Sequence, residues 1–192
     1  WGKGNGTNPV NMYENSIKVP FVASHPGVIP QGIVQPALVA SYDFMPTLLD
    51  YLGLPIPDTN LPGESFLKSL KGENDSGRDS IVVYDEYGYC RMIRTERWKY
   101  VHRYPDGPNE LWDLANDPDE RENLIDQAEH QELILELKAR MESWFEKYVD
   151  EDKDGITFDV GAGQHRPVGV KWDDGTDAFV YTAIKRRHPP KN

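Results

Sequence analysis

An amphipathic segment near the C-terminal end constrains the fold of this chain more than any other stretch. Its apolar side chains recur every three or four positions, which is the period of an α-helix with one buried face. They are Ile134, Leu137, Met141, Trp144, Phe145 and Tyr148. Such a helix needs an apolar surface to pack against. The sequence therefore predicts one long helix over residues 116–149 and a partner surface for it.

Residues 80–117 predict that partner surface. The segments "SIVVYDEY", "CRMIRTERWKYVHRY" and "NELWDLAND" are rich in β-branched and aromatic residues, and turns separate them. In the second segment two strands flank a turn near residues 95–97. The alternating pattern of these strands is seen in Ile93, Trp98, Tyr100 and His102. We expect a small antiparallel sheet packed by the long helix. Its other face is predicted to be exposed and basic, with Arg91, Arg94, Arg97, Lys99 and Arg103 close together.

The first half of the chain has a different pattern. Residues 17–24 predict a short strand, and residues 33–40 form a second apolar run interrupted by Pro36. Residues 41–53 predict a short helix that ends at Gly53, and one helical turn is expected at 65–71. The polar stretch "GENDSGRDS" places a boundary near residue 77. This divides the chain into 1–77, 78–150 and an extension, 151–192, with a last short strand at 178–184.

Composition excludes some classes of function. The 192 residues carry a net charge of −11, and an acidic protein is repelled by phosphates, so we expect no nucleic-acid partner. The sequence has no apolar run of the ~20 residues that a membrane span needs, so no membrane partner is expected. The single cysteine, Cys90, cannot form an intrachain disulfide.

The glycine-rich start, "WGKGNG", contains the first candidate for chemistry. It does not match a nucleotide-binding P-loop, because no strand precedes Lys3 and a glycine follows it. Two readings stay open from the residues alone: a terminal segment without a role, or a lysine held by glycines that stabilises charge on a sulfate or phosphate oxygen.

Other candidate sites are less complete. "DEDKDG" matches the first positions of a calcium-binding loop with Asp150, Asp152 and Asp154, but Gly161 stands where a bidentate Glu is needed. The five histidines form no zinc motif, and we assign no metal ligand in this chain. His102 and His165 are candidates for anion contacts. No serine-hydrolase elbow is present.

Four stretches, in order, resemble the C-terminal part of type I sulfatases of the alkaline-phosphatase-like superfamily. They are "WGK" leading to "NMYENSIKVPFVASHPG", then "ASYDFMPTLLDYLGLPIP", "RMIRTERWKYVHRY" and "NELWDLANDPDERENLI". The last resembles the family's "ELYDL–DP–E–NL" signature. The resemblance covers roughly residues 1–150 and implies an α/β fold: a C-terminal fragment of the alkaline-phosphatase-like fold that includes the small antiparallel sheet and its helix.

The resemblance implies hydrolysis of a sulfate ester, carried by a carbohydrate or an aryl group. In such enzymes a formylglycine is the nucleophile, a calcium ion neutralises the sulfate oxygens, and lysines, an arginine and histidines complete the pocket. Of that set, this chain contains a counterpart only of the lysine that comes late in the family's sequence. The resemblance makes it the catalytic residue Lys3. His102 and Arg103, on the small sheet, are candidate contacts for a sulfated small molecule or saccharide. The resemblance also suggests a periplasmic or secreted enzyme.

Several parts of the family's site have no counterpart in this sequence. Cys90 is followed by Arg91, Met92 and Ile93, which does not match the nucleophile motif Cys/Ser-x-Pro/Ala-x-Arg. The acidic calcium ligands are also absent. We therefore expect a C-terminal piece of a larger enzyme that is inactive without its N-terminal catalytic portion. The alternatives are a phosphoesterase or phosphonate hydrolase of the same superfamily, or a non-catalytic binding module with calcium at residues 150–154.

Overall fold

The structure is a computed structural model that describes residues 11–58, 60–73, 77–84, 90–104, 107–150, 154 and 156. It divides into two compact units. One contains the described residues up to 19 and from 82 onward, and the other contains residues 20–81. The predicted strand at 178–184 lies outside the described residues. Among the helices of the described part, none is both long and apolar enough to cross a bilayer.

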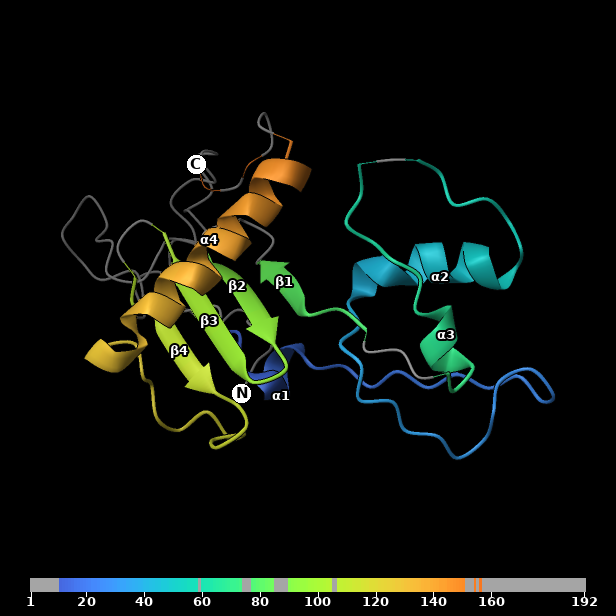
Figure 1. Cartoon of the computed structure of the whole chain (residues 1–192), viewed down its shortest axis with the longest axis horizontal. Coiled ribbons are helices and arrows are strands. Elements are labelled where there is room, and N and C mark those ends of the chain that lie inside the picture. The colour runs from blue at the N-terminus through green and yellow to red at the C-terminus, as the bar shows by residue number, and fades with distance from the viewer. Residues whose placement is uncertain are drawn as a thin grey trace, which may run out of the picture. The chain divides into compact units, whose positions relative to one another are not determined.

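The first unit is built on a small sheet. Its strands are β1 (Ser80–Tyr84), β2 (Cys90–Thr95), β3 (Trp98–Arg103) and β4 (Glu110–Asp113), in the order β1-β2-β3-β4. β3 pairs antiparallel with β2 and with β4. The helix α4 (Gln131–Tyr148) lies across one face of this sheet (Figure 1). The predicted sheet with its covering helix is therefore confirmed.

The register of the strands fixes the core under α4. Ile93 lies opposite Tyr100, and Tyr100 lies opposite Leu111, so all three side chains share one face. They pack against the predicted helical stripe, of which Leu137 and Met141 are 1% and 0% exposed. Burial of these side chains is the main force that holds the helix to the sheet.

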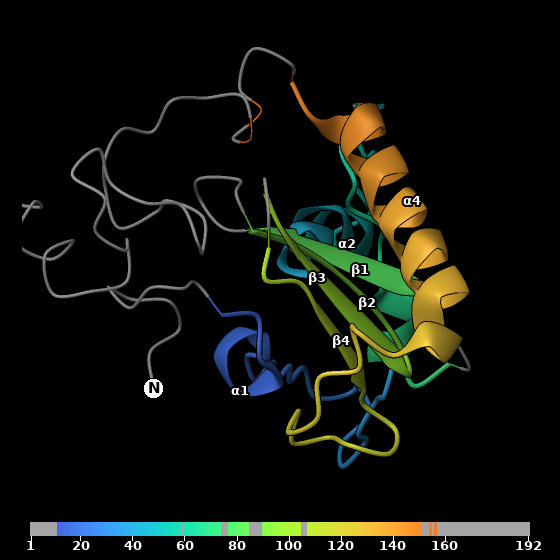
Figure 2. The same ribbon diagram turned by 90° about the vertical axis from the view of Figure 1, so that its left-hand side faces the viewer.

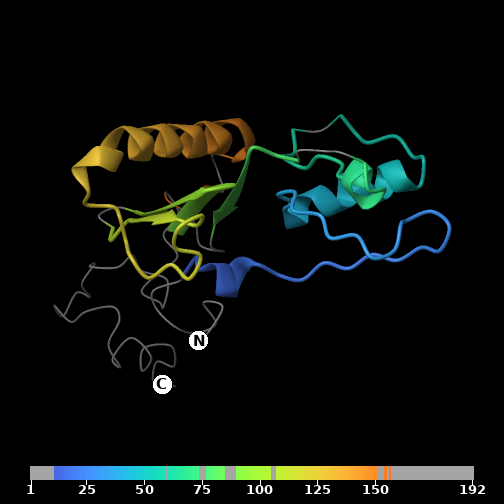
Figure 3. The ribbon, with the colours of Figure 1, turned by 60° about the horizontal axis from the view of Figure 1, so that its bottom comes forward.

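The opposite face of the sheet is also covered. The short helix α1 (Glu14–Ile17) and the residues just before it lie on this side (Figures 2 and 3). Met12, 3% exposed, packs there with Cys90, Met92 and Val101. This is a second apolar cluster, and it joins the beginning of the described chain to strands that follow about 80 residues later.

The long helix begins later than predicted. Residues 116–127 form turns, the 3-10 helix η2 spans Ala128–His130, and α4 starts at Gln131. The Asp117 carboxylate accepts hydrogen bonds from the backbone N–H groups of Arg121 and Glu122, at 2.7 and 2.9 Å. Aspartate side chains that bond to nearby backbone compete in this way with helix formation.

The second unit contains the 3-10 helix η1 (Ser41–Asp43), α2 (Phe44–Tyr51) and α3 (Leu67–Leu70). The predicted helix at 41–53 is confirmed, and Gly53, with φ 67°, ends it. The predicted turn of helix at 65–71 is confirmed as well. The predicted strand at 17–24 is wrong, because α1 takes Ile17 and no strand forms between residues 18 and 40. Pro20 and Pro36 lack the N–H that a strand ladder needs, and no described strand pairs with these segments.

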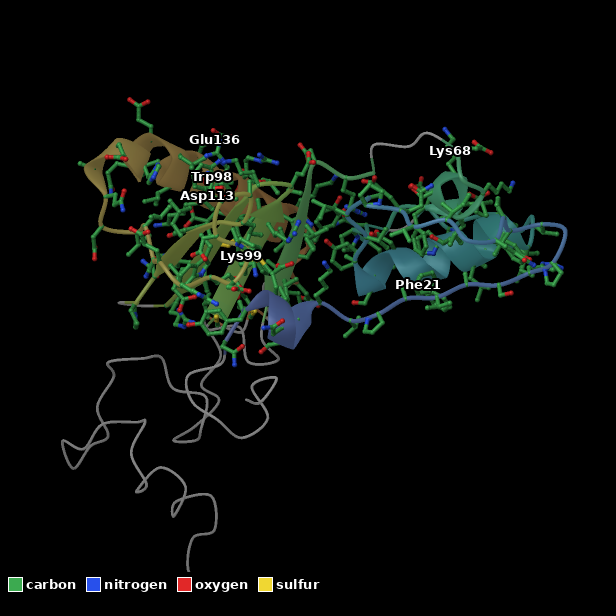
Figure 4. The ribbon with its side chains drawn as sticks, turned by 90° about the horizontal axis from the view of Figure 1, so that it is seen from below. Phe21, Lys68, Trp98, Lys99, Asp113 and Glu136 are labelled. Carbon is green, nitrogen blue, oxygen red and sulfur yellow. The ribbon has the colours of Figure 1, made fainter. Side chains whose placement is uncertain are left out.

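Much of the apolar surface of this second unit faces solvent. Val22 and Val34 are 89% and 92% exposed, and Leu52, directly after α2, is 58% exposed. Phe21 contacts the rings of Phe44 and Phe66 at centroid distances of 6.4 and 5.5 Å, yet it is itself 55% exposed (Figure 4). An exposed apolar surface of this extent marks a contact surface.

Candidate functional site

The predicted catalytic lysine, Lys3, lies outside the described residues. The first described residues that follow it, Asn11 and Met12, belong to the unit that contains the sheet. The described residues nearest to Lys3 along the chain therefore share a unit with the sheet, which also carries the two predicted substrate contacts, His102 and Arg103 on β3.

A buried lysine stands where this segment meets the sheet. Lys99 on β3 is 0% exposed, and Figure 4 shows it on the side of the sheet away from Trp98 and Asp113. Its Nζ donates to Glu14 Oε1 and Glu120 Oε1, both at 2.7 Å, and to the backbone carbonyl of Met12 at 2.9 Å. An ammonium group has three donors, so all three are satisfied.

Glu14 links this lysine to a second cation. Arg94 lies directly opposite Lys99 in the β2–β3 ladder, and its Nε donates to Glu14 Oε1 at 3.0 Å. Two like charges at opposed positions repel each other, and the carboxylate between them compensates. Burial opposes ionisation of Glu14, but the hydrogen bonds from Arg94 and Lys99 outweigh it and lower its pKa. Lys99, Arg94, Glu14 and Glu120 thus form a four-membered network of salt bridges.

Glu120 completes this network in an unusual backbone conformation. Its φ is 54°, and it is the one non-glycine with positive φ among the described residues. Its Oε2 accepts the backbone N–H of Glu14 at 2.7 Å. Glutamate rarely adopts this region, and it persists only where surrounding contacts hold it. Three of the stretches that carry the family resemblance therefore meet here, through Glu14, Lys99 and Glu120.

Arg103, the second predicted substrate contact, is engaged within the protein. It is 3% exposed, and its Nη1 lies 2.8 Å from both Glu110 Oε1 and the Pro108 carbonyl oxygen. Its backbone N–H donates to Asn109 Oδ1 at 2.9 Å. Both described partners of the guanidinium bond its Nη1.

His102 points to the other face, toward α4, and is 8% exposed. Its Nδ1 lies 2.7 Å from the Tyr100 hydroxyl, and its ring meets the Tyr104 ring edge-on at 4.3 Å. Burial lowers the pKa of His102 to about 4, and the Lys138 and Arg91 cations add to the effect. The imidazole is therefore neutral at pH 7.

Arg91 lies beside His102 on the same face. Its guanidinium carbon lies 3.7 Å from the centre of the Phe145 ring, and its Nη2 is paired with the Asp154 carboxylate. Asp154 belongs to the stretch that partly matches a calcium-binding loop. Asp152, which would have to act with it, lies outside the described residues.

The prediction of an exposed basic face is wrong. Arg91 and Lys99 are 3% and 0% exposed, and each basic side chain of the set is paired with a carboxylate. The pairs are Arg91–Asp154, Arg94–Glu14, Arg97–Asp113, Lys99–Glu14, Lys99–Glu120 and Arg103–Glu110. The physical reason is that both faces are covered: α1 and its neighbours cover the face with Arg94, Lys99 and Arg103, and α4 covers the face with Arg91. The sequence held one signal of this: alternation puts Lys99, Val101 and Arg103 on one face together, and the apolar Val101 needs a cover.

The described residues do not fit the two groups that the family implies. They include no cluster of three or more His, Cys, Asp or Glu side chains that could hold a metal ion. Cys90 is 4% exposed and packs among Met12, Met92 and Val101, which does not suit a nucleophile that must meet a substrate. No step through calcium or formylglycine can be built on the described part of this chain.

Comparisons with known proteins agree with this architecture. The model of the family described as N-sulphoglucosamine sulphohydrolase, C-terminal, matches residues 9–147. Delta 4,5-hexuronate-2-O-sulfatase of Bacteroides thetaiotaomicron is 30% identical over 158 residues, which are 76% of this chain and 32% of that protein. Arylsulfatase K of Rattus norvegicus is 34% identical over 150 residues, which are 70% of this chain and 25% of that protein.

A solved structure shows the same fold. It is a crystal structure of a protein classed as a sulfatase from Bacteroides thetaiotaomicron, with a TM-score of 0.51 and 28% identity, over 60% of this chain and 26% of that one. The chain thus spans about a third or less of the length of the relatives it matches. It belongs to the N-sulphoglucosamine sulphohydrolase, C-terminal, family and corresponds to the C-terminal part of sulfatases of the alkaline-phosphatase-like superfamily.

Proposed function

We propose that this chain is the C-terminal part of an enzyme that hydrolyses the sulfate esters of carbohydrates or aryl compounds. The observation that carries the proposal is the family match over residues 9–147. The names of the relatives supply the substrate class. They include a hexuronate-2-O-sulfatase, an N-acetylglucosamine-6-O-sulfatase and arylsulfatase K. A sulfated saccharide is accordingly the substrate class that we favour.

Lys3 is the catalytic residue that this chain contributes to the proposed site. Its ammonium is a compact cation that can stabilise negative charge on a sulfate oxygen or on the oxygen that leaves. The formylglycine nucleophile and the calcium ligands belong, in this proposal, to an N-terminal catalytic portion that precedes Trp1. When bound there, calcium would neutralise sulfate oxygens. The chain alone is then inactive.

The exposed apolar surface of residues 20–81 supports the need for that portion. Val22, Val34 and Leu52 are more than half exposed, although a self-contained unit would bury side chains of this kind. We propose that this surface packs against the N-terminal portion. Residues 17–24 and 33–40, which have the composition of strands but form none here, would then find the neighbouring strands that they lack.

His102 and Arg103 remain proposed contacts for the saccharide. Both side chains have internal partners, the Tyr100 hydroxyl and Glu110 respectively. We therefore propose that they act mainly by holding the residues next to them, Tyr104 for His102 and Pro108 and Asn109 for Arg103. Any direct contact requires Arg103 to share its guanidinium between Glu110 and a sulfate.

Sulfate release from an aryl sulfate tests the proposal. We expect none from the purified 192-residue chain, and release when the chain is produced together with the coding sequence that precedes it. Lys3→Ala in that combined protein is expected to remove most of the activity. Activity of the chain alone, above a Lys3→Ala control, would contradict the proposed division of the site. A Cys/Ser-x-Pro/Ala-x-Arg motif is expected about 200–300 residues upstream, from the usual size of such domains.

A further inference from the structure

We propose that Lys99, Glu14 and Glu120 are positioning residues that hold the segment following Lys3 against the small sheet. The inference rests on the proposed function, because it assumes that Lys3 faces the sulfate. The three residues and Arg94 form the Lys99 network described above. Its effect would be to fix the chain at Met12, before residues 20–81 begin.

The directions of the hydrogen bonds in the Lys99 network support this role. Two of the three acceptors of the Lys99 ammonium, the Met12 carbonyl and the Glu14 carboxylate, lie on the segment after Lys3. The third, Glu120, also accepts the Glu14 backbone N–H. Apolar packing is non-directional, whereas these short charged hydrogen bonds fix both the backbone and the side chain of the segment.

The cost of the arrangement supports it as well. A fully buried ion pair gives less stability than its short distances suggest, because both charges lose their hydration. Glu120 also holds a backbone conformation that is unfavourable for its residue type. The network thus lowers stability through desolvation and through the backbone of Glu120, yet every donor of Lys99 has an acceptor. The placement of a segment explains such a network better than stability alone.

The Lys99 network lies close to Lys3 along the chain, because Met12 is nine positions after Lys3. Met12 and Ile17 also pack against the sheet, and the Tyr13 ring lies 5.9 Å from the Trp112 ring, so loss of the network would shift the segment without detaching it. Misplacement of a reacting group by about 1 Å can cost up to about a hundredfold.

The test uses the chain combined with its preceding portion, and an aryl sulfate as substrate. Glu14→Gln keeps the size of the side chain and removes its charge, and we expect kcat to fall severalfold, by up to about a hundredfold. Arg97→Gln is the matched control. It breaks an ion pair of the same sheet, with Asp113 on the face toward α4, and is expected to leave kcat unchanged. Glu120→Gln is a second variant in case Glu14→Gln folds poorly.

A double variant separates positioning from a general loss of structure. If Glu14 acts through Lys3, then Lys3→Ala with Glu14→Gln is no slower than Lys3→Ala alone. If the double variant instead lowers kcat by the product of the two separate factors, the inference is overturned and the proposed function stays intact. Full activity of Lys3→Ala would overturn both.

Hydrogen exchange gives a direct readout of the segment. The amides of Ser16, Ile17 and Lys18 donate to the carbonyls of Tyr13 and Glu14. They should exchange at least about tenfold faster in Glu14→Gln but not in Arg97→Gln. Unchanged exchange there would also overturn the inference.

Discussion

The two units of this chain are held together by different means. In the unit with the sheet, apolar side chains fill both faces, and Met92, Val101, Leu111 and Met141 are all 0% exposed. In residues 20–81, by contrast, a carboxylate occupies the centre. Asp43 is 2% exposed, while apolar side chains around it face solvent.

Asp43 organises its unit by hydrogen bonds. Its carboxylate accepts the backbone N–H groups of Ala40 and Glu64, both at 2.9 Å, and pairs with the Arg78 guanidinium at 2.5 Å. Its backbone carbonyl accepts the Thr47 hydroxyl at 2.7 Å. Such a network fixes loops relative to one another, but it buries little apolar area. The comparison teaches that apolar packing holds the sheet unit together, whereas hydrogen bonds hold the other unit and leave many of its apolar side chains exposed.

The largest predicted effect tests the apolar core of the sheet unit. Leu137→Ala, at a position that is 1% exposed, is expected to destabilise this unit by about 2–5 kcal/mol, because it leaves a cavity under α4. Leu135→Ala is the same substitution on the same helix at a position that is 66% exposed, and it should stay within about 0.5 kcal/mol of the parent. Urea denaturation followed by Trp fluorescence measures both. Equal effects would contradict the packing described for α4.

A second, smaller effect tests the polar centre of residues 20–81. Asp43→Asn keeps the shape but removes the charge that faces Arg78, and we expect a loss of about 1.5–3 kcal/mol, typical of hydrogen bonds to charged groups. Asp50→Asn is the control, because the bond of Asp50 to the Ser65 hydroxyl is exposed. Hydrogen exchange should rise locally in residues 40–66 with Asp43→Asn and leave the sheet amides unchanged. A global rise would show that the units do not unfold separately.

The smallest predicted effect is a pH dependence of the sheet unit. Folding lowers the pKa of His102 from 6.5 to about 4, mainly by burial. The unfolded chain therefore binds more protons between these values, and stability falls as the pH drops from 6.5 toward 4. The contribution is on the order of 1–2 kcal/mol, because water still screens part of the site. The difference in thermal midpoint between pH 7 and pH 4.5 should be smaller in His102→Gln. An identical difference would contradict the burial of a neutral imidazole.

The sheet, its helix and the short helix at 41–53 could be predicted because each depends on local periodicity. The period of 3.6 in residues 134–148 and the alternation around Tyr100 specify which face is apolar without knowledge of distant residues. The end of the short helix at Gly53 follows from the same kind of local signal, since glycine accepts a positive φ. These features arise from neighbours within a few positions.

The charged network could not be predicted in the same way. Lys99 looks like an exposed strand residue until Glu14, 85 positions earlier, is placed on the same face. The start of α4 was misplaced for a related reason, because the hydrogen bonds of Asp117 compete with helix formation in a stretch of good helix formers. The strand expected at 17–24 needs a neighbouring strand, which no local pattern can supply.

Hydrogen exchange of the whole chain, alone and combined with its preceding portion, tests the central claim most directly. We predict that amides of β2 and β3 are protected in both samples, because both faces of the sheet are covered. Amides of residues 20–40 are predicted to exchange rapidly in the chain alone and to become protected in the combined protein, in step with the appearance of sulfatase activity. Protection of residues 20–40 in the chain alone, or no change in the active combined protein, would contradict the account.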